Sequence, residues 1–446
     1  MLNPNIFKAY DIRGLYPEEI NEDAVREIIR AFIDFLNPKT IIIGSDARQS
    51  SPALKEAVIE TFLMAGINVL DVGFCSTPLY YFAINSRGAD GGVMITASHN
   101  PKEYNGLKLC RQQAIAIGGE DGGYAMRDKI LAGEIKIAPR GEAGTLTKID
   151  VFEDYLGATL SLIDVDAIKP FKVVVDCGNG MAGQEIKKLF EKIPGEMIEL
   201  FFEPDGSFPN HEANPTKEEN LAALRKKMDE TDADLGIALD GDGDRVVFVD
   251  EKREPVRGDF ITALIAQDLL VEKHGEKICF EVRSSRAVKE AIEQAGGVPV
   301  LVRPGHSLIK EAMRRENMLF GGELSGHYFY RQFGFIENAL YTILLVLKII
   351  SDRDHSLAGA IAPLKKYALS GEINFTVQDP GEILTAVEQE FSDGQIKKID
   401  GLTVEYPDWW FNLRRSNTEP LVRLNMEANT EKLLAEKLEI VKRMII

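Results

Sequence analysis

Cysteine is scarce in this sequence, since a chain of 446 residues contains only four. They lie far apart and none belongs to a Cys-x-x-Cys pair: Cys75, Cys110, Cys177 and Cys279. This spacing argues against a disulfide framework and against a zinc site. We therefore predict four small, buried side chains in a protein of a reducing compartment.

Long apolar runs are also absent. The longest, at 339–350, is interrupted by polar residues and is shorter than the roughly 20 residues that a membrane-spanning helix needs. It predicts a buried helix instead. The chain does not open on a basic, apolar and small-residue segment, so we expect no secretory signal and a soluble, cytoplasmic protein.

Positive charge is in deficit, because 52 Lys and Arg residues stand against 70 Asp and Glu, which gives a formal net charge of −18. Such a surface repels polyanions, so we expect neither nucleic acid nor an anionic membrane as a partner. A small anionic substrate would have to bind in a locally basic cleft within an acidic protein.

The length predicts about three or four domains. Strand-like and helix-like segments alternate along most of the chain, and the pattern restarts twice. The last part differs, because 372–377, 403–406 and 421–427 alternate like half-exposed strands before a closing helix from about Thr430. We predict three α/β domains with mixed sheets, mostly parallel in the first, plus a smaller C-terminal α+β domain. The predicted bounds are 1–150, 151–254, 255–367 and 368–446.

An acidic loop gives the strongest chemical signal. It follows an apolar strand predicted at 235–239 and reads Asp240-Gly-Asp242-Gly-Asp244-Arg245. Three carboxylates at every second residue can turn several oxygens toward one point, as Mg²⁺ requires, and would otherwise repel one another. An exposed acidic turn is the alternative, but the adjoining apolar strand and Arg245 favour a cation site.

A serine loop, Thr96-Ala-Ser98-His-Asn-Pro101, follows a second apolar strand at 91–95. The carboxyl end of a strand in an α/β sheet is where ligands usually bind. Ser98 is small enough to expose its hydroxyl there, and Pro101 prevents the strand from continuing. Taken alone, the segment is more typical of an ordinary Ser/Asn/Pro turn than of a functional loop.

A glycine-rich loop, Gly321-Gly-Glu323-Leu-Ser325-Gly-His327, offers an acceptor and a donor suited to vicinal sugar hydroxyls. A plain hairpin would have a similar composition. Nearby, His306 stands just before a helix predicted at 307–315, where it is either a structural residue or a proton carrier.

A fourth loop, Arg414-Arg-Ser416-Asn417-Thr418-Glu-Pro420, combines arginines with hydroxyl and amide donors. Arginine makes bidentate, charge-assisted bonds to phosphate, so the loop predicts a phosphate pocket, with a polar turn between strands as the alternative. Together, a serine nucleophile, a cation site, a polyol-binding loop and a phosphate pocket are the parts that phosphoryl transfer to a sugar requires.

With these motifs in this order, the chain resembles the alpha-D-phosphohexomutase family, and within it the bacterial phosphomannomutase/phosphoglucomutase enzymes, over nearly its whole length. Further matching segments lie at 8–14, 104–108, 176–180, 208–211 and 305–307. The resemblance implies four domains around a central cleft and the interconversion of hexose 1-phosphate and hexose 6-phosphate, of mannose or glucose. It also implies one Mg²⁺ per chain, a hexose 1,6-bisphosphate as activator and intermediate, and a monomer or weak dimer.

The resemblance assigns roles residue by residue. Ser98 matches the phosphoserine and completes a magnesium site with Asp240, Asp242 and Asp244. The residues that match the basic reacting centre are Arg13, His99, Lys108, Arg245, His306 and His327. The residues that match the substrate site are Tyr10, Glu323, Ser325, Arg414, Ser416, Asn417 and Thr418.

Other functions remain open at this point. A phosphoglucosamine mutase would share the glycine-rich loop, so glucosamine phosphate is the main alternative substrate. A metal-dependent sugar phosphatase would use Asp240 as nucleophile, but it would have no use for the Ser98 loop, and a non-catalytic sensor should have lost the serine or a metal ligand. Arg283, Pro304 and Asn338 depart from the family pattern, which bears on substrate detail.

Overall fold

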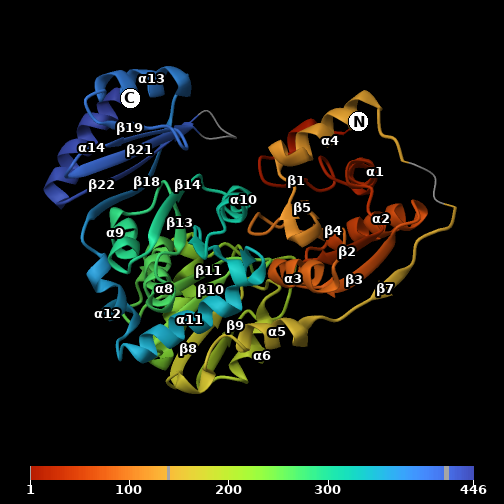
Figure 1. The fold of residues 1–446 in the computed structure, drawn as a ribbon, viewed down its shortest axis with the longest axis horizontal. Coiled ribbons are helices and arrows are strands. Elements are labelled where there is room, and N and C mark those ends of the chain that lie inside the picture. Colours follow the sequence, from red (N-terminus) through yellow and green to blue (C-terminus); the bar gives the residue numbers. More distant parts are fainter. Residues whose placement is uncertain (1, 138–140, 416–420) are drawn as a thin grey trace.

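The computed structural model describes residues 2–137, 141–415 and 421–446, which form four sheets with helices packed around them (Figure 1). Among the described residues, no helix is both long and apolar enough to cross a membrane. The apolar run predicted as a buried helix is helix α11 (Ala339–Asp352), and nearly all of it is buried. All four cysteines are free and buried, as predicted.

The first sheet has the strand order β1-β5-β4-β2-β3-β7, and β6 pairs with β5. Its strands are β1 (Ile12–Leu15), β2 (Thr40–Ser45), β3 (Asn68–Phe74), β4 (Gly91–Ile95), β5 (Tyr104–Arg111), β6 (Ile115–Ala116) and β7 (Leu146–Lys148). Its helices are α1 (Glu22–Leu36), α2 (Ser51–Met64), α3 (Thr77–Arg87) and α4 (Tyr124–Ala132).

This first sheet is mixed. Strands β4, β2, β3 and β7 are parallel, whereas β5 runs antiparallel to both β4 and β1. The pattern of the sequence alone predicts a mostly parallel sheet here and does not reveal β5. The connection from β4 to β5, residues 96–103, is too short for the crossover that a parallel neighbour needs, so the chain turns back at Pro101. The serine loop is this reversal.

The second sheet has the order β12-β11-β10-β8-β9. Its elements are α5 (Phe152–Leu160), β8 (Phe171–Asp176), α6 (Gly183–Phe190), β9 (Gly195–Leu200), α7 (Ala222–Thr231), β10 (Leu235–Leu239), β11 (Val246–Val249) and β12 (Pro255–Val256). A short 3-10 helix (Glu218–Leu221) leads directly into α7. The acidic loop connects β10 to the antiparallel strand β11.

The third sheet has the order β14-β13-β15-β16-β17. Its elements are α8 (Gly258–Glu272), β13 (Lys277–Glu281), α9 (Arg286–Gln294), β14 (Val298–Val302), α10 (His306–Glu316), β15 (Phe320–Gly322), β16 (Tyr328–Tyr330), β17 (Ile336–Glu337), α11 and α12 (Leu357–Ile361). His306 is the first residue of α10. The sequence pattern predicted that it lies just before this helix. The glycine-rich loop is the turn of the antiparallel β15–β16 pair.

The fourth sheet is antiparallel throughout, in the order β18-β22-β21-β20-β19. Its elements are β18 (Ala368–Thr376), α13 (Pro380–Glu390), β19 (Gln395–Lys397), β20 (Leu402–Glu405), β21 (Trp409–Arg415), β22 (Leu421–Ala428) and α14 (Glu431–Ile445). This is the expected fold class: three α/β domains with mixed sheets and a smaller α+β domain.

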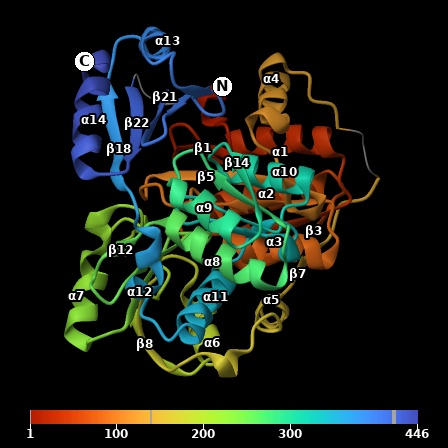
Figure 2. The ribbon, with the colours of Figure 1, turned by 60° about the vertical axis from the view of Figure 1, so that its left-hand side comes forward.

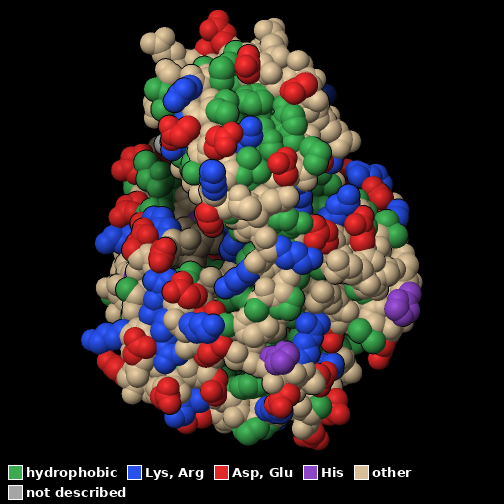
Figure 3. Space-filling view, turned by 90° about the vertical axis from the view of Figure 1, so that its left-hand side faces the viewer, with side chains coloured by type: hydrophobic (Ala, Val, Ile, Leu, Met, Phe, Trp, Pro, Cys, Tyr) green, Lys and Arg blue, Asp and Glu red, His purple; other side chains and the backbone are tan. Residues whose placement is uncertain are grey.

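One apolar core joins the first three sheets. Tyr80 of α3, Ile237 of β10 and Leu344 of α11 all belong to it, so the loops at the ends of these sheets are held in fixed relative positions. The fourth sheet has its own core, which includes Phe411 and Val441. The C-terminal domain lies apart from the first domain in the view of Figure 1, whereas in Figure 2 it adjoins the N-terminal end of the first domain, and Figure 3 shows the surface hollowed beneath it.

Candidate active site

The serine loop holds Ser98 in a rare backbone conformation. Ser98 has a φ of 51°, which is the left-handed region, and its amide donates to Thr96 Oγ1 at 2.9 Å. The residue is almost fully buried. Its hydroxyl donates to Asp240 Oδ2 at 2.8 Å and lies 3.0 Å from His99 Nδ1. The serine loop and the acidic loop, predicted separately, therefore meet at one point.

Arg48 holds the serine loop through hydrogen bonds to its backbone carbonyls. The sequence alone did not single out this residue. Its guanidinium donates to the carbonyls of Ser98, Asn100, Pro101 and Tyr104 at 2.6–2.9 Å, and its Nε donates to Asp46 at 3.1 Å. All five N–H groups of the fully buried side chain are used. The only sequence signal is an Asp-x-Arg directly after β2, and such a tripeptide is common.

The acidic loop turns its carboxylates inward. The amides of Asp244 and Arg245 donate to Asp240 Oδ1 at 3.1 and 3.2 Å, which closes the loop around that carboxylate. Burial, reinforced by the charges of Asp244 and Asp242, raises the pKa of Asp240 to about 8. Gly241 packs against the backbone of Ser98, where an added Cβ would lie 2.7 Å from the Ser98 carbonyl oxygen.

The three aspartates fit a divalent cation. Each offers one oxygen within 4.8 Å of the others, and all three are buried. Asp242 Oδ1 is buried and receives no hydrogen bond within the part of the chain that the structure describes. An unpaired buried carboxylate oxygen is costly unless a cation neutralises it. The donor set, oxygens only, suits a hard ion such as Mg²⁺.

A second cluster of possible metal ligands adjoins the three aspartates and consists of Asp244, His327 and Glu337. Lys310 Nζ lies 3.1 Å from both oxygens of Glu337, so both oxygens of this carboxylate have a partner, whereas Asp242 Oδ1 has none among the described residues. A cation is therefore better placed among the three aspartates of the acidic loop.

Lys108 of β5 reaches into the acidic loop. Its Nζ lies 2.6 Å from Asp242 Oδ2 and 2.6 Å from Asp244 Oδ2. Burial lowers the pKa of Lys108, but the two carboxylates outweigh burial and raise it above its ordinary value. Lys108 is thus held as a cation, which suits charge stabilisation better than proton transfer. Arg245 lies 3.7 Å from Asp240 Oδ2.

Arg13 and Tyr10 border the serine loop and the third domain. Arg13 donates to the Ala97 carbonyl at 3.1 Å and to Asn100 Oδ1 at 2.6 Å. The hydroxyl of Tyr10 donates to the Pro304 carbonyl at 3.1 Å, and its ring meets His306 edge-on. The N-terminal segment therefore contacts both the serine loop and the segment that precedes helix α10.

The β15–β16 turn is connected to the acidic loop through His327. Its Nδ1 lies 3.0 Å from Glu323 Oε2 and 2.9 Å from Ser325 Oγ, and its Nε2 lies 3.2 Å from Asp244 Oδ1. Burial opposes protonation, but the two carboxylates raise the pKa of His327 to about 9. Against the effect of burial, His327 lowers the pKa of Glu323 to about 2. His327 is therefore charged near pH 7.

The other two histidines of the predicted site, His306 and His99, are neutral. Burial and the charge of Lys310 lower the pKa of His306 well below its ordinary value, and neither ring nitrogen has a hydrogen-bond partner among the described residues. Burial and the charge of Arg245 lower the pKa of His99 in the same direction. A neutral imidazole can accept a proton, and His99 is the one beside the Ser98 hydroxyl.

The fourth loop is only partly described, because Ser416, Asn417 and Thr418 lie outside the described residues. Arg414 is described, and its guanidinium lies 2.6 Å from Glu372 Oε2. Arg283 is within 3.9 Å of the same carboxylate and 3.7 Å of Glu323 Oε1. These pairs bring the glycine-rich loop and the C-terminal domain together.

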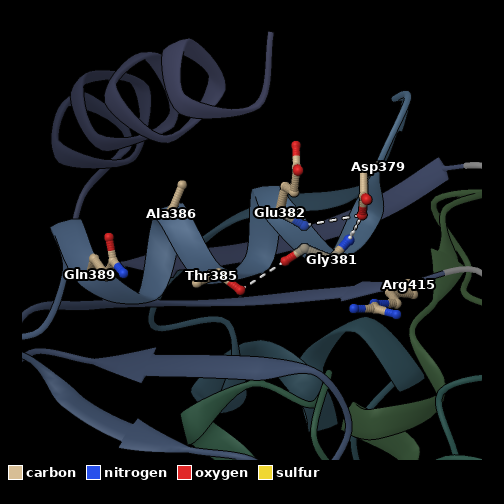
Figure 4. A pocket seen from close by; sticks show the side chains of 7 residues that line it. All are labelled: Asp379, Gly381, Glu382, Thr385, Ala386, Gln389 and Arg415. Carbon is tan, nitrogen blue, oxygen red and sulfur yellow. Dashed lines mark hydrogen bonds between the residues drawn. The ribbon is translucent and has the colours of Figure 1, made fainter.

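Arg415 lies on another face of the C-terminal domain. It borders a recess of about 660 Å³ beside helix α13, shown in Figure 4. Asp379 already accepts from the amides of Gly381 and Glu382 at the start of this helix, at 2.7 and 3.1 Å. The recess contains none of the residues that meet at Ser98.

Comparison with known proteins agrees with this geometry. Four models of phosphoglucomutase/phosphomannomutase match the chain: alpha/beta/alpha domain I at 4–124, domain II at 152–254, domain III at 257–367 and the C-terminal domain at 372–443. A protein named phosphohexose mutases from Xanthomonas campestris pv. campestris (strain B100) is 41% identical over 433 residues, 96% of either chain. A phosphomannomutase of Escherichia coli (strain K12) is 38% identical over 438 residues, also 96% of either chain.

A solved structure of a family member has the same fold. A phosphoglucomutase/phosphomannomutase family protein from Burkholderia thailandensis superposes with a TM-score of 0.91 at 32% identity, and the match covers 100% of this chain and 97% of the other. The chain therefore belongs to the phosphoglucomutase/phosphomannomutase family. Its activity is that of a hexose phosphate mutase, an isomerase of carbohydrate metabolism, and neither the phosphatase nor the sensor is favoured.

Proposed function

We propose that the enzyme moves a phosphoryl group through Ser98 and interconverts the 1- and 6-phosphates of mannose or glucose. The observation that carries this proposal is the 2.8 Å hydrogen bond from the Ser98 hydroxyl to Asp240. It joins a nucleophile of the first domain to a carboxylate of the second. A hydroxyl in that position is adjacent to the charges that phosphoryl transfer needs.

In the proposed cycle, the phosphoryl group on Ser98 is transferred to the free hydroxyl of a bound hexose phosphate. The bond from phosphorus to Ser98 Oγ breaks, a bond to the sugar oxygen forms, and the sugar hydroxyl loses its proton. Neutral His99, whose Nδ1 lies 3.0 Å from Ser98 Oγ, accepts that proton and passes it to Ser98 Oγ as this oxygen leaves. Arg245 and Lys108 balance the negative charge in the buried site.

The three aspartates, with an oxygen of phosphorylated Ser98, would hold Mg²⁺. When bound, this ion neutralises charge on the phosphoryl group and polarises it. The fit is supported by the unpaired oxygen of Asp242 and by the oxygen-only donor set.

The reaction gives a hexose 1,6-bisphosphate that turns over within the site before the other phosphate returns to Ser98. Glu323 and Ser325 are the proposed readers of the sugar hydroxyls. Tyr10, Arg414 and the loop at 416–418 are the proposed binders of the sugar and its non-transferring phosphate. The separate apolar core of the C-terminal domain supports its opening and closing over the sugar.

The proposal also includes the four domain bounds stated above, a cytoplasmic location, small hexose phosphates as the ligands and a monomer or weak dimer. The names of the curated relatives support mannose phosphate as a substrate. Glucosamine phosphate is the competing substrate, and a coupled assay with mannose, glucose and glucosamine 1-phosphates, Mg²⁺ and a trace of bisphosphate separates them.

Mutation of Ser98 tests the phosphoryl carrier. Ser98→Ala should bind hexose phosphate almost as the wild type does, by calorimetry, and should lose turnover. Incubation of the wild type with hexose 1,6-bisphosphate should leave one phosphoryl group on the peptide that contains Ser98, by mass spectrometry. Mutase activity in the alanine variant, or phosphate found on an aspartate, would contradict the proposal.

A further inference from the structure

Two consecutive hydroxyl residues join the first domain to the second at the start of helix α3. Ser76 is the N-cap of this helix, and its hydroxyl donates to Glu185 Oε2 of α6 at 2.9 Å. Thr77, the first residue of the helix, donates from Oγ1 to Asp242 Oδ2 at 2.5 Å. The amide of Thr77 also donates to the Asp242 carbonyl at 2.8 Å. Thr77 therefore contacts both the backbone and the side chain of the acidic loop.

The two oxygens of the Asp242 carboxylate have different surroundings. Oδ2 accepts from Thr77 Oγ1 and from Lys108 Nζ, at 2.5 and 2.6 Å. Oδ1 is buried and accepts from no described residue. Two donors on one oxygen stop the carboxylate from rotating, because a rotation would break both short bonds. Oδ1 is thereby left available to bind a cation.

Lys108 alone does not fix this orientation. Its ammonium also contacts Asp244 Oδ2 at 2.6 Å and ends a flexible four-carbon side chain. Thr77 is β-branched, which restricts χ1, and it stands in the first turn of a helix whose residues belong to the shared core. The threonine hydroxyl is the more rigid of the two donors.

We propose that Thr77 is a positioning residue of the metal site, holding Asp242 so that Oδ1 faces the cation. This inference rests on the proposed function, because it takes the three aspartates to be metal ligands. Thr77 itself touches neither the substrate nor the phosphoryl group. Groups that orient a metal ligand typically change metal affinity by 10- to 100-fold when they are removed.

The test measures binding of Mn²⁺ to the dephosphorylated enzyme by electron paramagnetic resonance, so it does not depend on turnover. Thr77→Val, which keeps the branched shape and loses the donor, should raise the Mn²⁺ Kd at least tenfold, or about 1.4 kcal/mol. Thr77→Ser keeps the donor and should stay within about threefold of the wild type. If the valine variant is not recovered folded, Thr77→Ala replaces it, with the same expected loss.

Ser76→Ala is the matched control at the same domain contact. It removes the hydroxyl that donates to Glu185, so it should lower the thermal midpoint and leave the Mn²⁺ Kd unchanged. An unchanged Kd in Thr77→Val or Thr77→Ala, or an equal loss of affinity in Ser76→Ala, overturns the role of Thr77. A wild type that binds no Mn²⁺, or an Asp242→Asn variant that binds it normally, would instead refute the proposed metal site.

Discussion

Arg48 offers the sharpest test of how the serine loop is held. Its five N–H groups have five acceptors, four of them carbonyl oxygens of residues 98–104, and the side chain is fully buried. Arg48→Lys keeps the charge but supplies only three N–H donors from a single point. At least two buried acceptors then lose their donor.

The magnitude follows from that count. A buried acceptor left without a hydrogen bond costs about 1–3 kcal/mol, so the substitution should cost about 2–6 kcal/mol of local stability. Domains of this kind have about 5–15 kcal/mol in total, so the loss is large. The serine loop and its flanking strands β4 and β5 should therefore open far more often, and turnover should fall with them.

Hydrogen exchange by mass spectrometry is the appropriate assay, because a four-domain chain does not unfold in one step. Peptides that cover residues 91–111 should exchange at least about thirtyfold faster in Arg48→Lys, as a loss of 2 kcal/mol implies. Arg26→Lys, at an exposed pair with Asp23 on α1, is the control and should change nothing measurable. Exchange within threefold of the wild type, together with normal kcat, would refute the reasoning.

Three further outcomes are expected. Burial raises the pKa of Glu185 to about 7. Between about pH 4.5 and 7 the folded state therefore holds a proton that the unfolded chain has released. The contribution of Glu185 to wild-type stability should fall as pH rises through this range. Glu185→Gln should remove this dependence, by up to about 3 kcal/mol at pH 8, and parallel thermal midpoints of variant and wild type from pH 5 to 8 would contradict it. Treatment with EDTA should abolish activity and Mg²⁺ should restore it, whereas full activity after exhaustive chelation would exclude a metal requirement. Arg283→Lys loses the two-point contact with Glu281 and should raise the KM for hexose phosphate about five- to tenfold with little change in kcat, an expectation that an unaltered KM would refute.

The sequence was most informative where the chemistry is local. The three aspartates lie within five residues of one another and follow an apolar strand, so the acidic loop could be predicted as a cation site from its own spacing. The buried helix α11 was also readable, because a mostly apolar run reports on its immediate neighbours, and the hairpin at 320–330 was the alternative that its glycines left open.

Other features depend on partners far away in the chain. Strand β5 was missed because its central positions are buried on both faces and show no alternation. Arg48 and Thr77 were missed because a single arginine or threonine has no distinguishing neighbours, and their importance lies in contacts 50 and 165 residues away.

The sequence by itself determined most of the strands and helices, the acidic loop and the family motifs, because each depends on residues close together in the chain. Only the tertiary structure decided that the Ser98 hydroxyl donates directly to Asp240, 142 residues away, and that Asp242 Oδ1 accepts from none of the described residues. The physical reason is that one apolar core packs three sheets against each other, and this packing sets which loops share a site.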